Sequence, residues 1–163
     1  MGAGESDELQ DPGLDQRIDQ MLTEARVILP GAQALLGFQL AMVLMEPFAQ
    51  LPPLAKMVHL ASLGFIALAT IVLMAPAAYH RIVERGEDTE RFHRFASWMV
   101  LLALALLAPG FAGEVYVVLV RAELRSWAWI AAALSLFIFY ASWFGAMLLI
   151  RRRSAHLRQR PAH

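Results

Sequence analysis

The sequence predicts an all-α integral membrane protein, a bundle of four transmembrane helices that run up and down in turn, with an N-terminal amphipathic helix. Hydrophobic residues make up 58% of the 163 residues, against roughly 45–50% in soluble domains. Four long apolar stretches, about 27–46, 57–80, 95–114 and 127–150, are separated by charged or Pro-rich segments. A helix of about 20 residues crosses the hydrocarbon layer of a bilayer, which is about 30 Å thick.

The N-terminal segment divides into two parts. Residues 1–13 are rich in acidic side chains, Gly and Pro, a composition typical of a disordered acidic tail. From Leu14 to Arg26, apolar residues recur at helical spacing among charged ones, which predicts the amphipathic helix. This helix either lies on the membrane surface or leads into the first span.

The first two spans are joined by a short turn. Pro30 is expected in the first turn of the first span, where its missing N–H is not needed. The Pro-rich turn from Ala49 to Ala55 makes the first two spans antiparallel neighbours. The second span ends in Tyr79-His80-Arg81, residues suited to the headgroup region.

The last two spans differ in their interruptions. Pro109-Gly110 lies within the third span, so we expect a bend or a broken turn near Ala105 to Pro109. The fourth span carries no charge and is followed by three consecutive Arg residues, 151–153. The membrane domain therefore covers residues 14–153, and residues 154–163 form a basic cytoplasmic tail.

The basic residues predict the orientation in the membrane. With four spans, the two termini and the connector between spans two and three share one side, and this side holds eleven of the fourteen Lys and Arg residues. The other side holds Lys56, Arg121 and Arg125. Cytoplasmic segments carry the excess of basic residues, so we expect an inner-membrane protein with both termini in the cytoplasm.

Several short motifs carry a resemblance to a known family. They are Glu24-Ala25-Arg26-Val27, Leu29-Pro30-Gly31 with Gln33, Phe38-Gln39, and Ala75-Pro76-x-Ala78-Tyr79-His80-Arg81. The chain resembles, from about Leu22 to Arg152, an uncharacterised bacterial family of small four-span integral membrane proteins. Members of this family are sometimes labelled sodium:proton antiporters, a label that carries no mechanism to individual residues.

One group of polar residues in the spans is a candidate ion or proton path. It comprises Gln39, Glu46, His59, Thr70 and Glu114. His59, Ser62 and Thr70 share one helix face, and such residues either pack by hydrogen bonding to a neighbouring helix or line a path. Glu46 and His59 lie near the outer ends of adjacent spans, so a contact between them is geometrically feasible. No carboxylate lies at mid-span, which argues against antiport.

A second group, at the inner face, comprises Glu24, Arg26, His80 and Arg81. These residues are expected at similar depth, where Glu24 and the basic side chains would form a structural ion-pair cluster. The alternative is a binding site for a ligand or a lipid headgroup, formed by Arg26, His80 and Arg81.

The remaining chemistry of the sequence is sparse. The absence of Cys excludes disulfides and thiolate sites, and no metal-binding, phosphate-binding or catalytic motif is found. We therefore expect no metal, no cofactor and no enzymatic activity. Balanced charge gives no reason to expect a nucleic-acid partner.

The function expected from the sequence is that of a non-enzymatic structural or accessory membrane component, with the lipid bilayer and either a second copy or another membrane protein as partners. The alternative is a small oligomeric cation or proton transporter. A haem or quinone redox protein is a remote alternative, suggested by His80 and His93.

Overall fold

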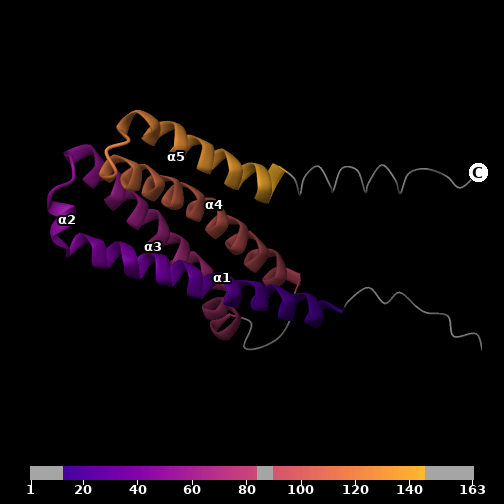
Figure 1. Cartoon of the computed structure of the whole chain (residues 1–163). Coiled ribbons are helices and arrows are strands. Elements are labelled where there is room, and N and C mark those ends of the chain that lie inside the picture. The colour runs from indigo at the N-terminus through magenta and orange to yellow at the C-terminus, as the bar shows by residue number, and fades with distance from the viewer. Residues whose placement is uncertain (1–12, 84–89, 146–163) are drawn as a thin grey trace, which may run out of the picture.

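The computed structural model describes residues 13–83 and 90–145, and these residues are helical throughout except for short turns (Figure 1). Four long helices, α1 (Leu14–Val43), α3 (Pro53–Ile82), α4 (Glu90–Arg121) and α5 (Arg125–Tyr140), make up most of the fold. A short helix, α2 (Glu46–Ala49), lies between α1 and α3, and a π-helical segment, Ala141–Gly145, continues α5. The fold is all-α, and these four helices, α5 together with its π-helical continuation, are long and apolar enough to cross a membrane.

Helix α1 begins earlier than a membrane span requires. The segment from Leu14 to Arg26, expected as an amphipathic helix that either lies on the membrane surface or leads into the first span, is continuous with that span. Pro30 therefore lies sixteen residues inside the helix, and the expectation that it occupies the first turn is wrong. A proline in this position removes the backbone hydrogen bond to the carbonyl of Arg26, four residues earlier.

The long helices alternate in direction, and the described ends of α1 and α5 that lead to the two termini lie at the same end of the molecule (Figure 1). Helices α3 and α4 form the central and most extensive contact. Helix α5 packs chiefly on α4, and α1 packs chiefly on α3. Helix α1 also contacts α4, where Met21 packs with Phe92 and Ala96. The arrangement is thus three helices in mutual contact, with α5 added on α4.

Small residues bring the central helices close together. Ala69 of α3 and Ala103 of α4 are fully buried in one core cluster. Gly110 is also buried, and a Cβ added to it would lie 2.5 Å from Cγ1 of Ile66. Such small side chains let helix backbones approach, which is how helices gain packing energy in lipid.

Pro109 does not break α4, which runs without interruption from Glu90 to Arg121. Its ring leaves the carbonyl of Ala105, four residues earlier, without the usual helical donor. The hydroxyl of Tyr140, on α5, donates a hydrogen bond to this carbonyl at 2.9 Å. The neighbouring helix thus replaces the bond that proline removes, and the turn stays helical.

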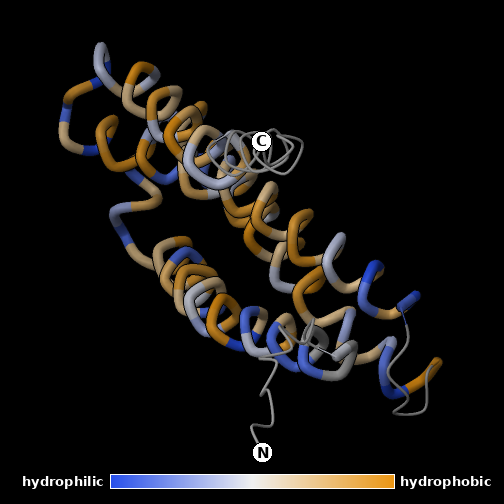
Figure 2. Tube along the Cα trace, turned by 90° about the vertical axis from the view of Figure 1, so that its right-hand side faces the viewer, coloured by the Kyte–Doolittle hydropathy of each residue, from blue (hydrophilic) through white to orange (hydrophobic). Residues whose placement is uncertain are grey.

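Apolar residues occupy the middle of the long helices, and hydrophilic residues gather toward their ends and in the connections (Figure 2). The helices run beyond the expected apolar spans, because α3 begins at Pro53 and α4 ends at Arg121. Residues 1–12 of the expected acidic tail, the end of the fourth span from 146 to 150, and the basic tail from 154 to 163 lie outside the described residues.

Candidate functional site

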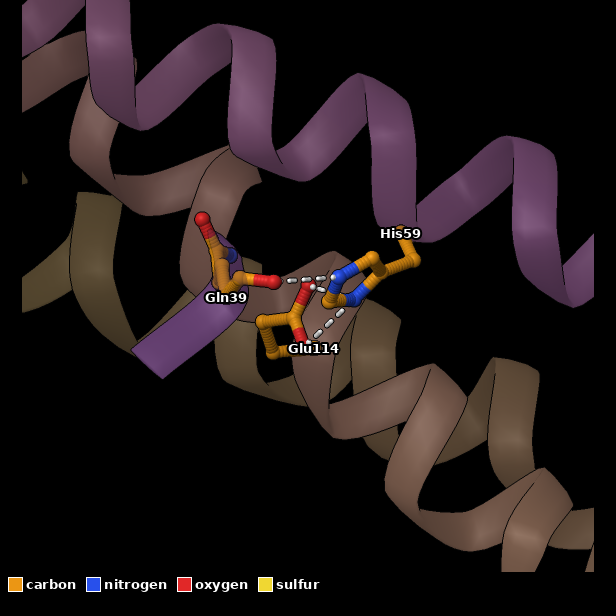
Figure 3. Close-up of polar contacts among 3 residues, drawn as sticks. All are labelled: Gln39, His59 and Glu114. Atoms are coloured by element: carbon orange, nitrogen blue, oxygen red, sulfur yellow. Dashed lines mark hydrogen bonds and ion pairs between the residues drawn. The ribbon is translucent and has the colours of Figure 1, made fainter. Parts of the chain in front are cut away.

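Three helices meet at the imidazole of His59. This side chain comes from the second turn of α3 and is fully buried. Its Nδ1 lies 3.0 and 3.2 Å from the two carboxyl oxygens of Glu114 on α4. Its Nε2 lies 3.1 Å from the backbone carbonyl oxygen of Gln39 on α1 (Figure 3). We call these three residues the His59 cluster.

The partners of His59 determine how many protons the cluster holds. A backbone carbonyl can only accept a hydrogen bond, so Nε2 must carry a proton and donate it to Gln39. At Nδ1, either the imidazolium donates to the Glu114 carboxylate, or the Glu114 carboxylic acid donates to a neutral ring. In both forms the pair shares one proton and is neutral overall, which limits the cost of burying it.

The cluster keeps unused hydrogen-bonding capacity. The side chain of Gln39 is 3% exposed and lies beside the Glu114 carboxyl group, but its carboxamide forms no hydrogen bond of good geometry among the described residues. Oε1 of Glu114, although 3.0 Å from Nδ1 of His59, also forms no hydrogen bond there. Buried polar atoms without partners are uncommon in folded proteins and mark sites that deserve a functional explanation.

The His59 cluster lies toward the end of the molecule that carries α2. Gln39 is four residues before the end of α1, and Glu114 is seven before the end of α4. At 1.5 Å per residue these positions lie about 6 and 10 Å from the helix ends. The side chain of Glu114 is 20% exposed, so the pair is covered but not completely enclosed by the described chain.

Beyond the cluster, toward the middle of the helices, the contact between α3 and α4 is closely packed. Ser62 and Ile66 of α3 lie directly against Gly113 and Gly110 of α4. Thr70, two turns farther along α3 from Ser62, is buried and donates to the carbonyl of Ile66 at 2.8 Å. Thr70 is therefore satisfied by its own helix and does not join the His59 cluster.

Of the five residues expected to form a path, the structure brings together Gln39, His59 and Glu114. Glu46 is exposed at the start of α2 and forms no described contact with His59. The residue of α2 that reaches the imidazole is Phe48, whose ring centroid lies 5.5 Å from that of His59. Sequence reasoning missed Phe48, because a lone aromatic residue in a Pro-rich turn gives no indication of its direction.

The inner-face residues divide between two grooves beside α1. Arg26, His80 and Arg81 line a groove between α1 and α3. Glu24 lines a different groove, between α1 and α4, together with His93. Glu24 thus lines a different groove from the three basic side chains.

The two histidines considered for haem also line these separate grooves. His80 lines the groove between α1 and α3, and the centroid of its ring lies 4.8 Å from that of Phe92. His93 lines the groove between α1 and α4, and its Nδ1 is buried without a hydrogen-bond partner among the described residues. The two imidazoles thus do not line a common cavity where they could serve as axial ligands of one haem.

The fold and the site together define a class, that of multi-pass α-helical membrane proteins with a buried, hydrogen-bonded ionisable pair between helices. Within this class, the chain belongs to the family described as "Family of unknown function (DUF6328)", which matches residues 7–147. No curated protein and no solved structure matches the chain.

Proposed function

We propose that the protein is a non-enzymatic structural or accessory component of the membrane that works by pairing with a second copy of itself through α1. The observation that carries this proposal is Gln33. Its side chain is exposed on α1, ten residues before the helix ends at Val43. This distance is about 15 Å, which places the carboxamide near the middle of a hydrocarbon layer about 30 Å thick.

An exposed carboxamide at this depth is costly unless another polar group satisfies it. No hydrogen bond to the side-chain carboxamide of Gln33 occurs among the described residues. The hydroxyls of Thr70, Ser97 and Ser135 differ, because each donates to the carbonyl four residues earlier in its own helix. Such local bonds to the backbone are typical of Ser, Thr, Asn and Asp rather than Gln, so the carboxamide of Gln33 favours a partner outside the described chain.

The surroundings of Gln33 suit a second copy of α1. Gly37 lies one turn farther along, and a Cβ added there would meet nothing within 4 Å. Ala34 and Ala41 are also exposed on this helix. Small residues allow two helices to approach closely in lipid, and a carboxamide both donates and accepts hydrogen bonds. Two copies of Gln33 would therefore satisfy each other across a twofold interface, which closes at a dimer.

Cysteine cross-linking in membranes tests this pairing, because the chain has no Cys of its own. The probe is Ala34→Cys on α1. The matched control is Ala133→Cys, an exposed alanine on α5, at about the same depth, 12 to 14 Å from the same end of the molecule. We expect cross-linked dimers from Ala34→Cys, few from Ala133→Cys, and a marked reduction when Gln33→Leu is combined with Ala34→Cys. Equal cross-linking at both positions would contradict the proposal.

A second candidate function is small-cation or proton transport, in line with the antiporter label that the resemblance suggests. The observation that favours it is the contact of His59 Nδ1 with the Glu114 carboxyl group, beside the carboxamide of Gln39. Ionisable residues inside membranes often mark such pathways. The close packing of Ser62 and Ile66 against α4 weighs against a continuous path through one chain.

Liposome flux distinguishes the two functions. If the first proposal is right, the wild-type protein adds no cation-dependent proton flux to that of empty liposomes. If the protein is a transporter, the flux is present and Glu114→Gln abolishes it, because an amide cannot exchange a proton. Glu46→Gln is the matched control, since Glu46 is exposed outside the cluster. Flux that is lost only in Glu114→Gln would favour the transporter.

A further inference from the structure

A groove between α1 and α3 combines an apolar wall with a basic end. Its volume is about 610 Å³. The apolar part includes Leu29 of α1 together with Leu73 and Met74 of α3. Arg81 lies at the end of the groove that faces the terminal side of the molecule, near the end of α3. Arg26 lies deeper along α1, between Leu22 and Leu29, which also line the groove.

The charge at this end is not neutralised by the described chain. Arg26 and Arg81 are exposed, and neither forms an ion pair with any residue in 13–83 or 90–145. The nearest acidic residue in sequence to Arg26, Glu24, lines the other groove beside α1. At the opposite end of the molecule, by contrast, Arg125 lies 3.8 Å from Glu123 and Arg121 donates to Gln50.

On α3 the polar and apolar parts of the groove follow one another along the helix axis. Eight residues separate Arg81 from Leu73 on α3, which is about 12 Å. A phospholipid has the same sequence of groups, with a phosphate at the interface and acyl chains below it. A small soluble anion would bind to the arginines but would make no contact with the apolar wall of the groove.

We propose that this groove binds an anionic phospholipid, with its phosphate between Arg26 and Arg81 and one acyl chain along Leu29, Leu73 and Met74. The guanidinium groups bind phosphate oxygens in paired hydrogen bonds. Basic pockets between membrane helices select anionic headgroups in this way. Arg26 and Gln33 are seven residues apart and so share a face of α1, where the groove borders the proposed pairing surface. The two tests are distinct, because lipid binding is measured by headgroup selectivity and pairing by cross-linking.

Native mass spectrometry of the detergent-purified full chain tests the site, using phosphatidylglycerol and phosphatidylcholine with identical acyl chains as probes. We expect retention of phosphatidylglycerol by the wild type, and about a tenfold loss in the double variant Arg26→Gln/Arg81→Gln. The matched control is Arg91→Gln/Arg94→Gln, which removes the same charge from α4 at the same end of the molecule and outside the groove. Ala77→Trp places a large side chain in the apolar part of the groove. It should also reduce the retention of phosphatidylglycerol, although both arginines stay in place.

Three results would overturn the proposal. Equal retention of the two lipids would show that the headgroup charge is not recognised. An equal loss in the α4 control would show a general attraction to the basic end. Displacement of phosphatidylglycerol by millimolar inorganic phosphate, together with unchanged binding in Ala77→Trp, would show an anion site rather than a lipid site. A thermal unfolding profile like that of the wild type confirms that each variant is folded.

Discussion

Gly110 determines how closely α3 and α4 approach one another. The residue is buried against Ile66, and the backbone carbonyl of Ser62 lies 3.3 Å from the position that a Cβ would occupy. Neither the branched side chain nor the backbone can move away without disturbing the contact between the two helices. Position 110 therefore requires a glycine, because no room is left for a Cβ between the two helices. Glycine in a helix interior is otherwise unfavourable.

Replacing this glycine should separate the two helices. We expect Gly110→Ala to lower the free energy of unfolding by about 1–3 kcal/mol, the usual cost of overpacking a core. The measurement is denaturation in detergent followed by circular dichroism. Gly64→Ala is the matched control, because nothing lies within 4 Å of a Cβ added to Gly64 of α3. Similar stability of the two variants would contradict this account.

The His59 cluster was only partly predictable from the sequence. Gln39, His59 and Glu114 could be chosen as polar residues of apolar spans, but their partners could not. His59 contacts Gln39 through a backbone carbonyl, which every residue possesses and no sequence pattern marks. The choice between Glu46 and Glu114 depends on how α2 turns after α1, and this was not predictable from the Pro-rich segment.

At the scale of the helices, proline had different consequences at different positions. The sequence located Pro109 within a span and predicted a disturbance there. It could not show that Tyr140, 31 residues later, supplies a donor to the exposed carbonyl of Ala105. The error at Pro30 has another origin, because its position is counted from the start of the apolar span at Val27, whereas the helix already begins at Leu14 and continues through the charged segment.

The bond between α5 and the proline turn can be measured by a double-mutant cycle. We expect Tyr140→Phe to destabilise the protein by about 0.6 kcal/mol, the average for hydrogen bonds between membrane helices. In Pro109→Ala, the new N–H can bond to Ala105 within the helix, so Tyr140→Phe should then cost clearly less. Identical costs in the two backgrounds would mean that the hydroxyl does not compensate for the proline.

At the scale of the whole molecule, the number of spans and the alternation of their directions followed from the apolar stretches alone. The packing of α1 on both α3 and α4, with α5 added on α4, did not follow from them, because the sequence does not state which faces of four apolar helices meet. Ala69 and Ala103 meet across α3 and α4, whereas many similar alanines remain exposed. Whether an alanine is buried or exposed depends on how each helix is rotated about its own axis. Hydropathy gives little information on this rotation in a membrane, because lipid-facing and helix-facing residues are both apolar.

The orientation in the membrane is a prediction at this scale. Because eleven of fourteen basic residues lie on the side of the termini, we expect both termini in the cytoplasm. Reporter fusions at His163 and between Glu87 and Glu90 should both give the cytoplasmic signal, and a fusion at Glu123 the periplasmic signal. A periplasmic signal from either of the first two would exclude four spans in the predicted orientation.

The order in which the helices pack also has a consequence for folding during synthesis. Helices that follow one another along the chain lie side by side in space, so each can dock on its predecessor as the ribosome delivers it. All three residues of the His59 cluster precede Arg121, and they can assemble before α5 has entered the bilayer. A nascent chain halted after α4 should therefore already contain the buried contact between His59 and Glu114. Helix α5 would then pack on a surface of α4 that is already folded.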